Sequence, residues 1–230
     1  MKLFVVSDTH SYFDEMIKAL DEAGFDKENP NHMLIHCGDT VDRGPKPAAM
    51  IDYLMALPNK VLVRGNHESL MLDMMQRGFP RSNDFHNGTY QTVLDLAPNT
   101  EGFRAACSVA YSKMKLMFNI MVDYFETQHY IFTHGYIPFW EDWRNASYDA
   151  WEEARWLNGF DESEHYPVGG KQIVVGHWHC SYANHSAYGT PEWGEGANFE
   201  PYIDNDIICI DACTAYSKKV NVLVLEDKLI

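Results

Sequence analysis

Short apolar runs rich in β-branched residues alternate with polar clusters along most of the chain. Runs of this length and composition are typical of buried strands. Five of them end abruptly in polar residues, at residues 3–6, 33–35, 61–63, 130–132 and 173–175. We therefore predict five strands whose last residues lead directly into polar loops.

Between the first of these runs, apolar residues recur at the spacing of an α-helix. Phe13, Ile17 and Leu20 share one apolar face, whereas Asp14 and Lys18 lie opposite. Similar patterns follow residues 33–35 and 61–63. Alternation of strand and helix predicts an α/β sheet with crossover helices.

The remaining segments give weaker patterns. Residues 207–210 and 220–225 are separated by a polar turn and predict an antiparallel strand pair. Residues 78–127 are predicted to be mostly helical and to form a cap, and residues 181–206 are predicted to form a long loop. No Pro/Gly-rich linker divides the chain, so we expect a single domain over residues 1–230.

The amino-acid composition excludes some classes of binding partner. The 230 residues include 33 acidic and 18 basic side chains, which gives a formal charge of −15. This charge argues against nucleic acid and anionic membranes as partners, because both require basic surfaces. The five cysteines are scattered, and the apolar run at the start is too short for a signal peptide, so we expect a cytoplasmic protein.

Chemically active side chains follow each of the five predicted strands. In order along the chain they are Asp8 and His10, then Asp39, Asp42 and Arg43, then Arg64, Asn66, His67 and Glu68, then His134, and last His177 and His179. Ligands bind at the carboxyl ends of strands in α/β sheets, so these residues should converge. Each short motif alone is common as an ordinary turn. Converging carboxylates would repel one another unless cations compensated them, and oxygen and imidazole donors suit Mn, Fe or Zn.

The motifs resemble those of the calcineurin-like metallophosphoesterases, whose pattern is D-x-H, G-D-x-x-D-R-G, G-N-H-E, H and G-H-x-H. The G-D-T-V-D-R-G and R-G-N-H-E forms resemble the serine/threonine protein phosphatase branch, in particular its bacterial and phage members such as lambda phosphatase. The resemblance implies a four-layer α/β/β/α sandwich with metals at the carboxyl ends of the strands, plus a small helical cap.

The resemblance also implies a dinuclear metal site, with Mn²⁺ the first choice in vitro and Fe or Zn as alternatives. Asp8 and His10 would bind the first metal, and Asp39 would bridge both. The second metal would be completed by Asn66, His134 and His177. His179 matches the last histidine of G-H-x-H, which binds the first metal in the wider superfamily.

The same resemblance assigns the catalytic groups. His67 would protonate the leaving group, and Asp42 would orient its imidazole. Arg43 and Arg64 would bind phosphate oxygens. Relatives use a further arginine for phosphate, and Arg155 is our candidate.

Two features leave alternatives open. Arg155 could equally be a helix-surface arginine that pairs with Glu152. Ser7 and Ser11 stand where relatives usually have glycine, which a serine can replace only if its φ is not positive.

These assignments predict a dimetal phosphohydrolase that cleaves phosphomonoesters by in-line attack of a metal-bridging hydroxide. A serine/threonine protein phosphatase is the leading hypothesis, with a phosphorylated protein or a small phosphoester as substrate. A diadenosine tetraphosphate hydrolase is the alternative, because Gly176-His177-Trp178 resembles the G-H-W segment of that family. A non-catalytic scaffold with the same fold would have lost ligand residues, whereas every ligand position here is filled.

Overall fold

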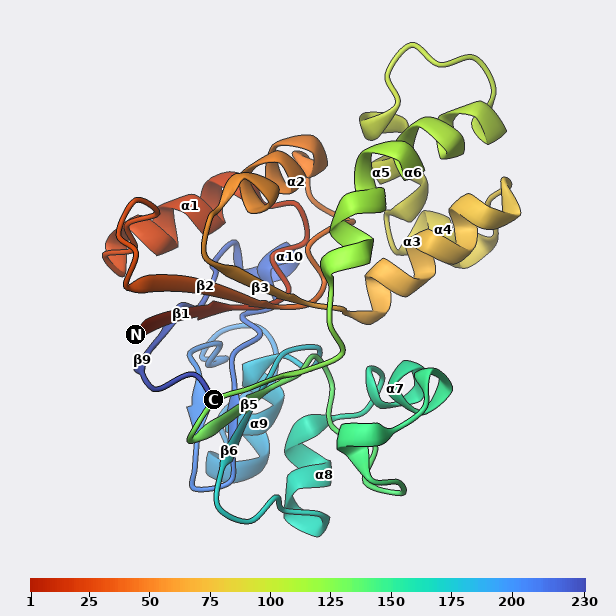
Figure 1. The fold of residues 1–230 in the computed structure, drawn as a ribbon. Helices are drawn as coiled ribbons and strands as arrows, with labels where there is room; N and C mark the ends of the chain where they lie inside the picture. The colour runs from red at the N-terminus through yellow and green to blue at the C-terminus, as the bar shows by residue number, and fades with distance from the viewer.

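Two β-sheets stack face to face, and helices cover the outer side of each (Figure 1). The computed structural model describes residues 1–230. The first sheet has the order β3-β2-β1-β9, and all neighbours are parallel except β9 and β1. Its strands are β1 (Lys2–Val6), β2 (His32–Cys37), β3 (Lys60–Val63) and β9 (Leu223–Glu226).

The second sheet has the order β4-β5-β6-β8-β7, with a parallel centre and an antiparallel strand at each edge. Its strands are β4 (Phe125–Glu126), β5 (Tyr130–Phe132), β6 (Gln172–Val175), β7 (Tyr202–Ile203) and β8 (Ile207–Cys209).

Helices of the first half cover the outer face of the first sheet. They are α1 (Phe13–Glu22), α2 (Pro47–Ala56), α3 (Asn66–Arg77), the short α4 (Ser82–His86), α5 (Thr89–Leu96) and α6 (Phe103–Ile120). Later helices lie on the second sheet or in its loops: η1 (Trp143–Asn145), α7 (Tyr148–Ala154), α8 (Gly159–His165), α9 (Cys180–Tyr188) and α10 (Thr214–Ser217). None of these helices combines the length and the apolar composition that a membrane span requires.

Alternation along the strands explains the four layers. Leu3 and Val5 of β1 point between the sheets, where they meet Phe132 and Val174, whereas Phe4 points outward to the helices. Because both faces of each central strand are buried, the strands read as continuous apolar runs. The predicted α/β/β/α sandwich is confirmed.

Two predictions about the C-terminal third were wrong. β8 and β9 do not pair: β8 lies parallel to β6 in the second sheet, and β9 lies antiparallel to β1 in the first. Both strands contribute to the layer between the sheets, so the polar turn joins two sheets instead of two neighbours. The segment 181–206, predicted to be a loop, contains most of α9 and all of β7. The side chain of His179 caps the start of α9 by accepting the Tyr182 N–H.

Residues 78–127 are largely helical, as predicted, in α4, α5 and α6. Of these helices, α5 and α6 contact α2 and α3 and share the core on the outer side of the first sheet, whereas α4 contacts α3 and α5. The division into one domain with a cap stays a prediction.

Candidate active site

A pocket of about 300 Å³ opens where the strands of both sheets end. Most of its lining comes from the loops after β1, β2, β3 and β6 and from the start of α3. The lining residues are Asp8, His10, Asp39, Arg43, Asn66, His67, Leu70, Asn83, Asn87, Trp156 and His177. His134 lies fully buried beside them, with Nε2 3.4 Å from Asp39 Oδ1. The strand-end positions therefore converge as the sequence indicated.

Backbone strain concentrates in these loops. Seven of the ten non-glycine residues with positive φ belong to them: Asp8, His10, Ser11, Asp39, Asp42, Arg43 and His177. Such conformations cost free energy and persist where surrounding contacts enforce them, often at functional sites. Gly176 shows how tightly the loops pack, since a Cβ there would lie 2.2 Å from Asp8 Oδ2.

Glu68 connects the loops after β2 and β3 through hydrogen bonds to both. Its carboxylate accepts the N–H groups of Gly65, Asp39 and Thr40 and also the Thr40 hydroxyl. Burial alone would raise the pKa of Glu68, but these hydrogen bonds lower it below its usual value. The ionised carboxylate thus fixes the backbone that presents Asp39.

Asp39 lies between two groups of imidazoles. Its Oδ1 faces His134, while its Oδ2 lies 3.7 Å from His10 Nε2. Candidate ligand atoms cluster in the same two groups, His10–Asp39–His67 and Asp39–His134–His177. Burial and the nearby Asp8 charge raise the pKa of Asp39 well above its usual value.

The imidazoles have the protonation that metal binding needs. Nδ1 of His10 donates to the Val41 carbonyl and Nδ1 of His134 donates to the Cys37 carbonyl, so each Nε2 carries a lone pair. Burial lowers the pKa of His10, His134 and His177, the last to about 3, which keeps the rings neutral at pH 7.

His134 Nε2 lies 2.8 Å from Asn66 Oδ1. Because His134 already donates through Nδ1, these facing atoms are both lone-pair donors, a contact that a shared cation would relieve. The oxygen and imidazole donors of the site fit a pair of divalent cations. They are Asp8, His10, Asp39, Asn66, His134 and His177.

His67 is oriented by Asp42. Nδ1 of His67 donates to Asp42 Oδ2 at 2.8 Å, and both side chains are buried. Arg43 donates to Nε2 of His67 at 3.1 Å and to Nε2 of His10 at 3.0 Å. The guanidinium therefore lies inside the pocket, between the two imidazoles.

Three residues predicted for the site face elsewhere. Arg64 donates to the Phe118 carbonyl, and Arg155 is buried and pairs with Glu152 and Asp123. His179 contacts Ser181 Oγ at 2.8 Å, and its Nε2 lies 3.5 Å from Glu192. The geometry gives no support to a phosphate or metal role for these three, and their assignments stay predictions.

Four residues near the site were missed by sequence reasoning. Asn83 and Trp156 line the pocket but belong to no ligand motif, and Leu70 lies one helical turn after His67. Asp211 is buried after β8, and burial together with Asp8 raises its pKa well above normal. The strand-end rule would have found Asp211 if β8 had been placed in the correct sheet.

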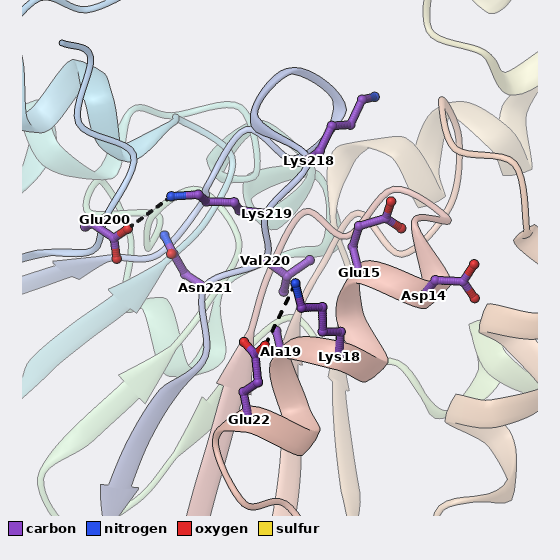
Figure 2. Close-up of a pocket in the computed structure, with 10 residues that line it drawn as sticks. All are labelled: Asp14, Glu15, Lys18, Ala19, Glu22, Glu200, Lys218, Lys219, Val220 and Asn221. Carbon is purple, nitrogen blue, oxygen red and sulfur yellow. Dashed lines mark ion pairs between the residues drawn. The ribbon is translucent and has the colours of Figure 1, made fainter.

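A larger hollow of about 560 Å³ lies between α1 and residues 218–221 (Figure 2). Its lining contains none of the strand-end residues. Lys18 pairs with Glu22 at 3.9 Å and Lys219 pairs with Glu200 at 3.6 Å, so much of its charge is already balanced. The smaller pocket is therefore the candidate active site.

The sandwich with carboxylates and imidazoles at its strand ends is similar in fold to the solved metallophosphoesterase of Sphaerobacter thermophilus, with a TM-score of 0.54 at 13% identity over 99% of this chain and 90% of the other. The chain belongs to the calcineurin-like phosphoesterase family, whose model matches residues 1–206 and which uses a dinuclear metal site.

Similar proteins carry two different activities. A segment of 71 residues is 37% identical to the serine/threonine-protein phosphatase 1 of Salmonella typhimurium (strain LT2) and covers 31% of this chain and 32% of that protein. A segment of 77 residues is 35% identical to the symmetrical bis(5'-nucleosyl)-tetraphosphatase of Glaesserella parasuis serovar 5 and covers 33% of this chain and 28% of that protein. The matches thus span about a third of each curated relative.

The fold is also similar to the crystal structure of a protein assigned as a diadenosine tetraphosphatase. The TM-score is 0.60 at 12% identity, over 97% of this chain and 93% of the other. At this identity the likeness concerns the fold alone.

Proposed function

We propose that this phosphoesterase cleaves phosphomonoesters with a pair of divalent cations and acts on phosphoserine or phosphothreonine in proteins. One observation carries the proposal. Asp39 lies between two groups of imidazoles, and the Asp42–His67 pair lies in the same pocket. The similarity to a serine/threonine-protein phosphatase supports this choice of substrate.

The residues divide the chemistry between them. The cations would be held by Asp8, His10, Asp39, Asn66, His134 and His177. When bound they supply Lewis-acid activation of water and neutralise the phosphoryl charge. The planar guanidinium of Arg43 matches phosphate oxygens.

His67 would act as the general acid. A phosphate that engages Arg43 would free Nε2 of His67 to take a proton from solvent. The ring then gives that proton to the leaving oxygen as water adds to phosphorus and the P–O bond breaks. Asp42 holds the tautomer through Nδ1 and orients the ring. The alcohol leaves neutral, and phosphate is the other product.

A second candidate substrate is a dinucleoside polyphosphate. Trp156 lines the pocket, is 49% exposed and lies edge-on to His177, with the ring centres 5.8 Å apart. Trp178, which follows His177, is 39% exposed. Exposed indoles beside a phosphate site can stack on nucleobases, and the tetraphosphatase relative is consistent with such a substrate.

The activity is tested with p-nitrophenyl phosphate. Protein loaded with Mn²⁺ should hydrolyse it, and EDTA should abolish turnover until metal is restored. His67→Asn should lower kcat with a phosphoserine peptide, whose leaving group needs a proton, by about 10²–10⁴, while bound metal, measured by inductively coupled plasma spectroscopy, is unchanged. No turnover with Mn²⁺, Fe²⁺ or Zn²⁺ would refute the proposal, and metal loss in the variant would show that His67 is a ligand instead.

The substrate is tested by comparing kcat/KM for a phosphoserine peptide, a phosphotyrosine peptide and diadenosine tetraphosphate. We expect the phosphoserine peptide to be preferred. Preference for the dinucleotide, reduced by Trp156→Ala, would favour the second candidate. The cytoplasmic location and the choice of Mn²⁺ in vitro stay predictions.

A further inference from the structure

The hydroxyl of Thr89 makes a contact with the catalytic pair that no sequence motif indicated. Thr89 begins α5 and donates to Asp42 Oδ2 at 2.7 Å. The same oxygen accepts Nδ1 of His67 at 2.8 Å. Thr89 and Asp42 are fully buried, and the other carboxylate oxygen of Asp42 has no hydrogen-bond partner.

The backbone is built to allow this contact. Gly88 has a φ of 83°, and a Cβ at this position would lie 2.6 Å from the backbone nitrogen of Arg43. Only a glycine lets the turn before α5 approach the Asp42–Arg43 loop this closely. Asp42 and Arg43 also have positive φ, so both sides of the contact are constrained.

The contact decides how the carboxylate is held. Asp42 accepts both of its side-chain hydrogen bonds on Oδ2, one from His67 and one from Thr89, and Oδ1 accepts none. These two bonds are therefore the only side-chain hydrogen bonds that fix the rotation of the carboxylate. Without the Thr89 donor, a buried anion would keep one hydrogen bond, and the imidazole would be oriented less firmly. Misplacement of a catalytic group by a fraction of an ångström slows the step that it assists.

We propose that Thr89 is a positioning residue for protonation of the leaving group, acting through Asp42 and His67. This inference rests on the proposed role of His67 as general acid. In that step the P–O bond to the leaving group breaks, and the proton on His67 Nε2 moves to the departing oxygen. Thr89 should therefore matter for substrates whose leaving group needs a proton, such as serine phosphates, and not for p-nitrophenyl phosphate.

The test compares phenyl phosphate with p-nitrophenyl phosphate, because phenolate is the poorer leaving group. In Mn²⁺-loaded protein, Thr89→Val should lower kcat/KM about 10-fold with phenyl phosphate and less than about twofold with p-nitrophenyl phosphate. Thr89→Ser, which keeps the hydroxyl, should behave as wild type with both. Thr92→Val is the matched control, because buried Thr92 lies in the same helix and donates only to the Gly88 carbonyl.

Thr89→Ala is a second route to the same outcome. It removes the hydroxyl without placing a methyl group against Asp42 and should give the same selective loss. This variant decides the matter if Thr89→Val does not fold, as judged by circular dichroism. Equal loss with both substrates, or no loss with either, would overturn the inference.

His67→Asn separates this inference from the proposed function. Selective loss in His67→Asn but not in Thr89→Val would overturn the role of Thr89 alone. No selectivity in either variant would overturn the acid role of His67, and the inference with it. Hydrolysis of p-nitrophenyl phosphate by the wild type that EDTA abolishes would still support a metal-dependent phosphoesterase in that case.

Discussion

Ser11 stands in the left-handed region with a φ of 60°, and its buried hydroxyl has no hydrogen-bond partner. This conformation costs a non-glycine residue roughly 1–2 kcal/mol, and an unpaired buried polar group adds a similar amount. Ser11→Gly should therefore raise the free energy of unfolding by about 1 kcal/mol after the greater chain entropy of glycine is included. Urea unfolding measures this change.

The control for Ser11→Gly is activity. The main chain of Ser11 bonds to the Thr40 carbonyl and the Lys46 N–H, and both bonds survive the substitution. Hydrolysis of p-nitrophenyl phosphate should thus stay at the wild-type rate. A lower urea midpoint would show that the Ser11 hydroxyl has a partner that stabilises it.

His36 predicts how stability depends on pH. Its ring is buried, Nε2 lies 2.8 Å from Thr9 Oγ1, and burial lowers its pKa to about 4. In the unfolded chain His36 has a pKa of ~6.5 and binds the proton first, so stability falls as the pH drops from ~6.5 towards ~4. The contribution of His36 to this loss is about 2 kcal/mol between pH ~7 and ~5.

His36→Gln removes this titration and should flatten the dependence over the same window. Urea unfolding at both pH values, with EDTA present, measures the difference between variant and wild type. The other buried histidines titrate in both proteins and cancel in that difference. An equal loss of stability in both proteins would contradict the prediction.

At the scale of elements, Asp227 connects the two sheets at the end of β9. It accepts hydrogen bonds from the Thr127 hydroxyl at 2.7 Å and from the N–H and Nδ1 of His129, both in the turn between β4 and β5. Burial alone would raise the pKa of Asp227, but these donors lower it to about 2. Such a group stabilises the fold above pH ~3.9, and the contribution is lost as the pH falls through about 2.

Asp227→Asn should lower the free energy of unfolding at pH ~7 by about 1–3 kcal/mol. The reason is that the buried carboxylate loses its charge-assisted hydrogen bonds to Thr127 and His129. Thermal and urea unfolding at pH ~7 measure the effect. Asp206→Asn is a matched control, since Asp206 is an exposed carboxylate in the loop before β8. Equal stability of the Asp227 variant and the wild type would show that strand pairing alone holds β9 in place.

The elements that the sequence predicts well are those with local patterns. The five strand ends and the early helices follow from periodicity and polar breaks, and they place Asp39 and Asn66 in one pocket with His134 beside it. Local pattern could not show which sheet β8 and β9 join, because that choice depends on the layer between the sheets. Asp211 was missed for this reason.

Side-chain direction is the other limit. His179 follows the same strand as His177, but it caps α9 and faces Glu192. Thr89 lies 47 residues from Asp42 in the chain, and only the turn at Gly88 brings them together. Motifs therefore name candidates, whereas caps and turns decide which candidates enter the pocket.

At the scale of the whole molecule, the acidic surface and the site have opposite charges. The chain carries a formal charge of −15, yet two divalent cations would add ~+4 beside Arg43 in the pocket. A phosphate group close to the pocket is attracted, whereas an acidic segment on either side of it meets a repulsive surface. The long-range field should therefore select substrates by the charge that flanks the phosphate.

This contrast predicts a salt-dependent preference among phosphopeptides. At ~0.01 M ionic strength, where charges interact over about 30 Å, kcat/KM should be about 10-fold higher for a phosphoserine peptide flanked by lysines than for one flanked by glutamates. At ~1 M the screening length is about 3 Å, and the ratio should approach one. p-Nitrophenyl phosphate, which has no flanking charge, controls for effects of salt on the site itself. A ratio that ignores salt would mean that contacts inside the pocket, and not the field of the molecule, select the sequence around the phosphate.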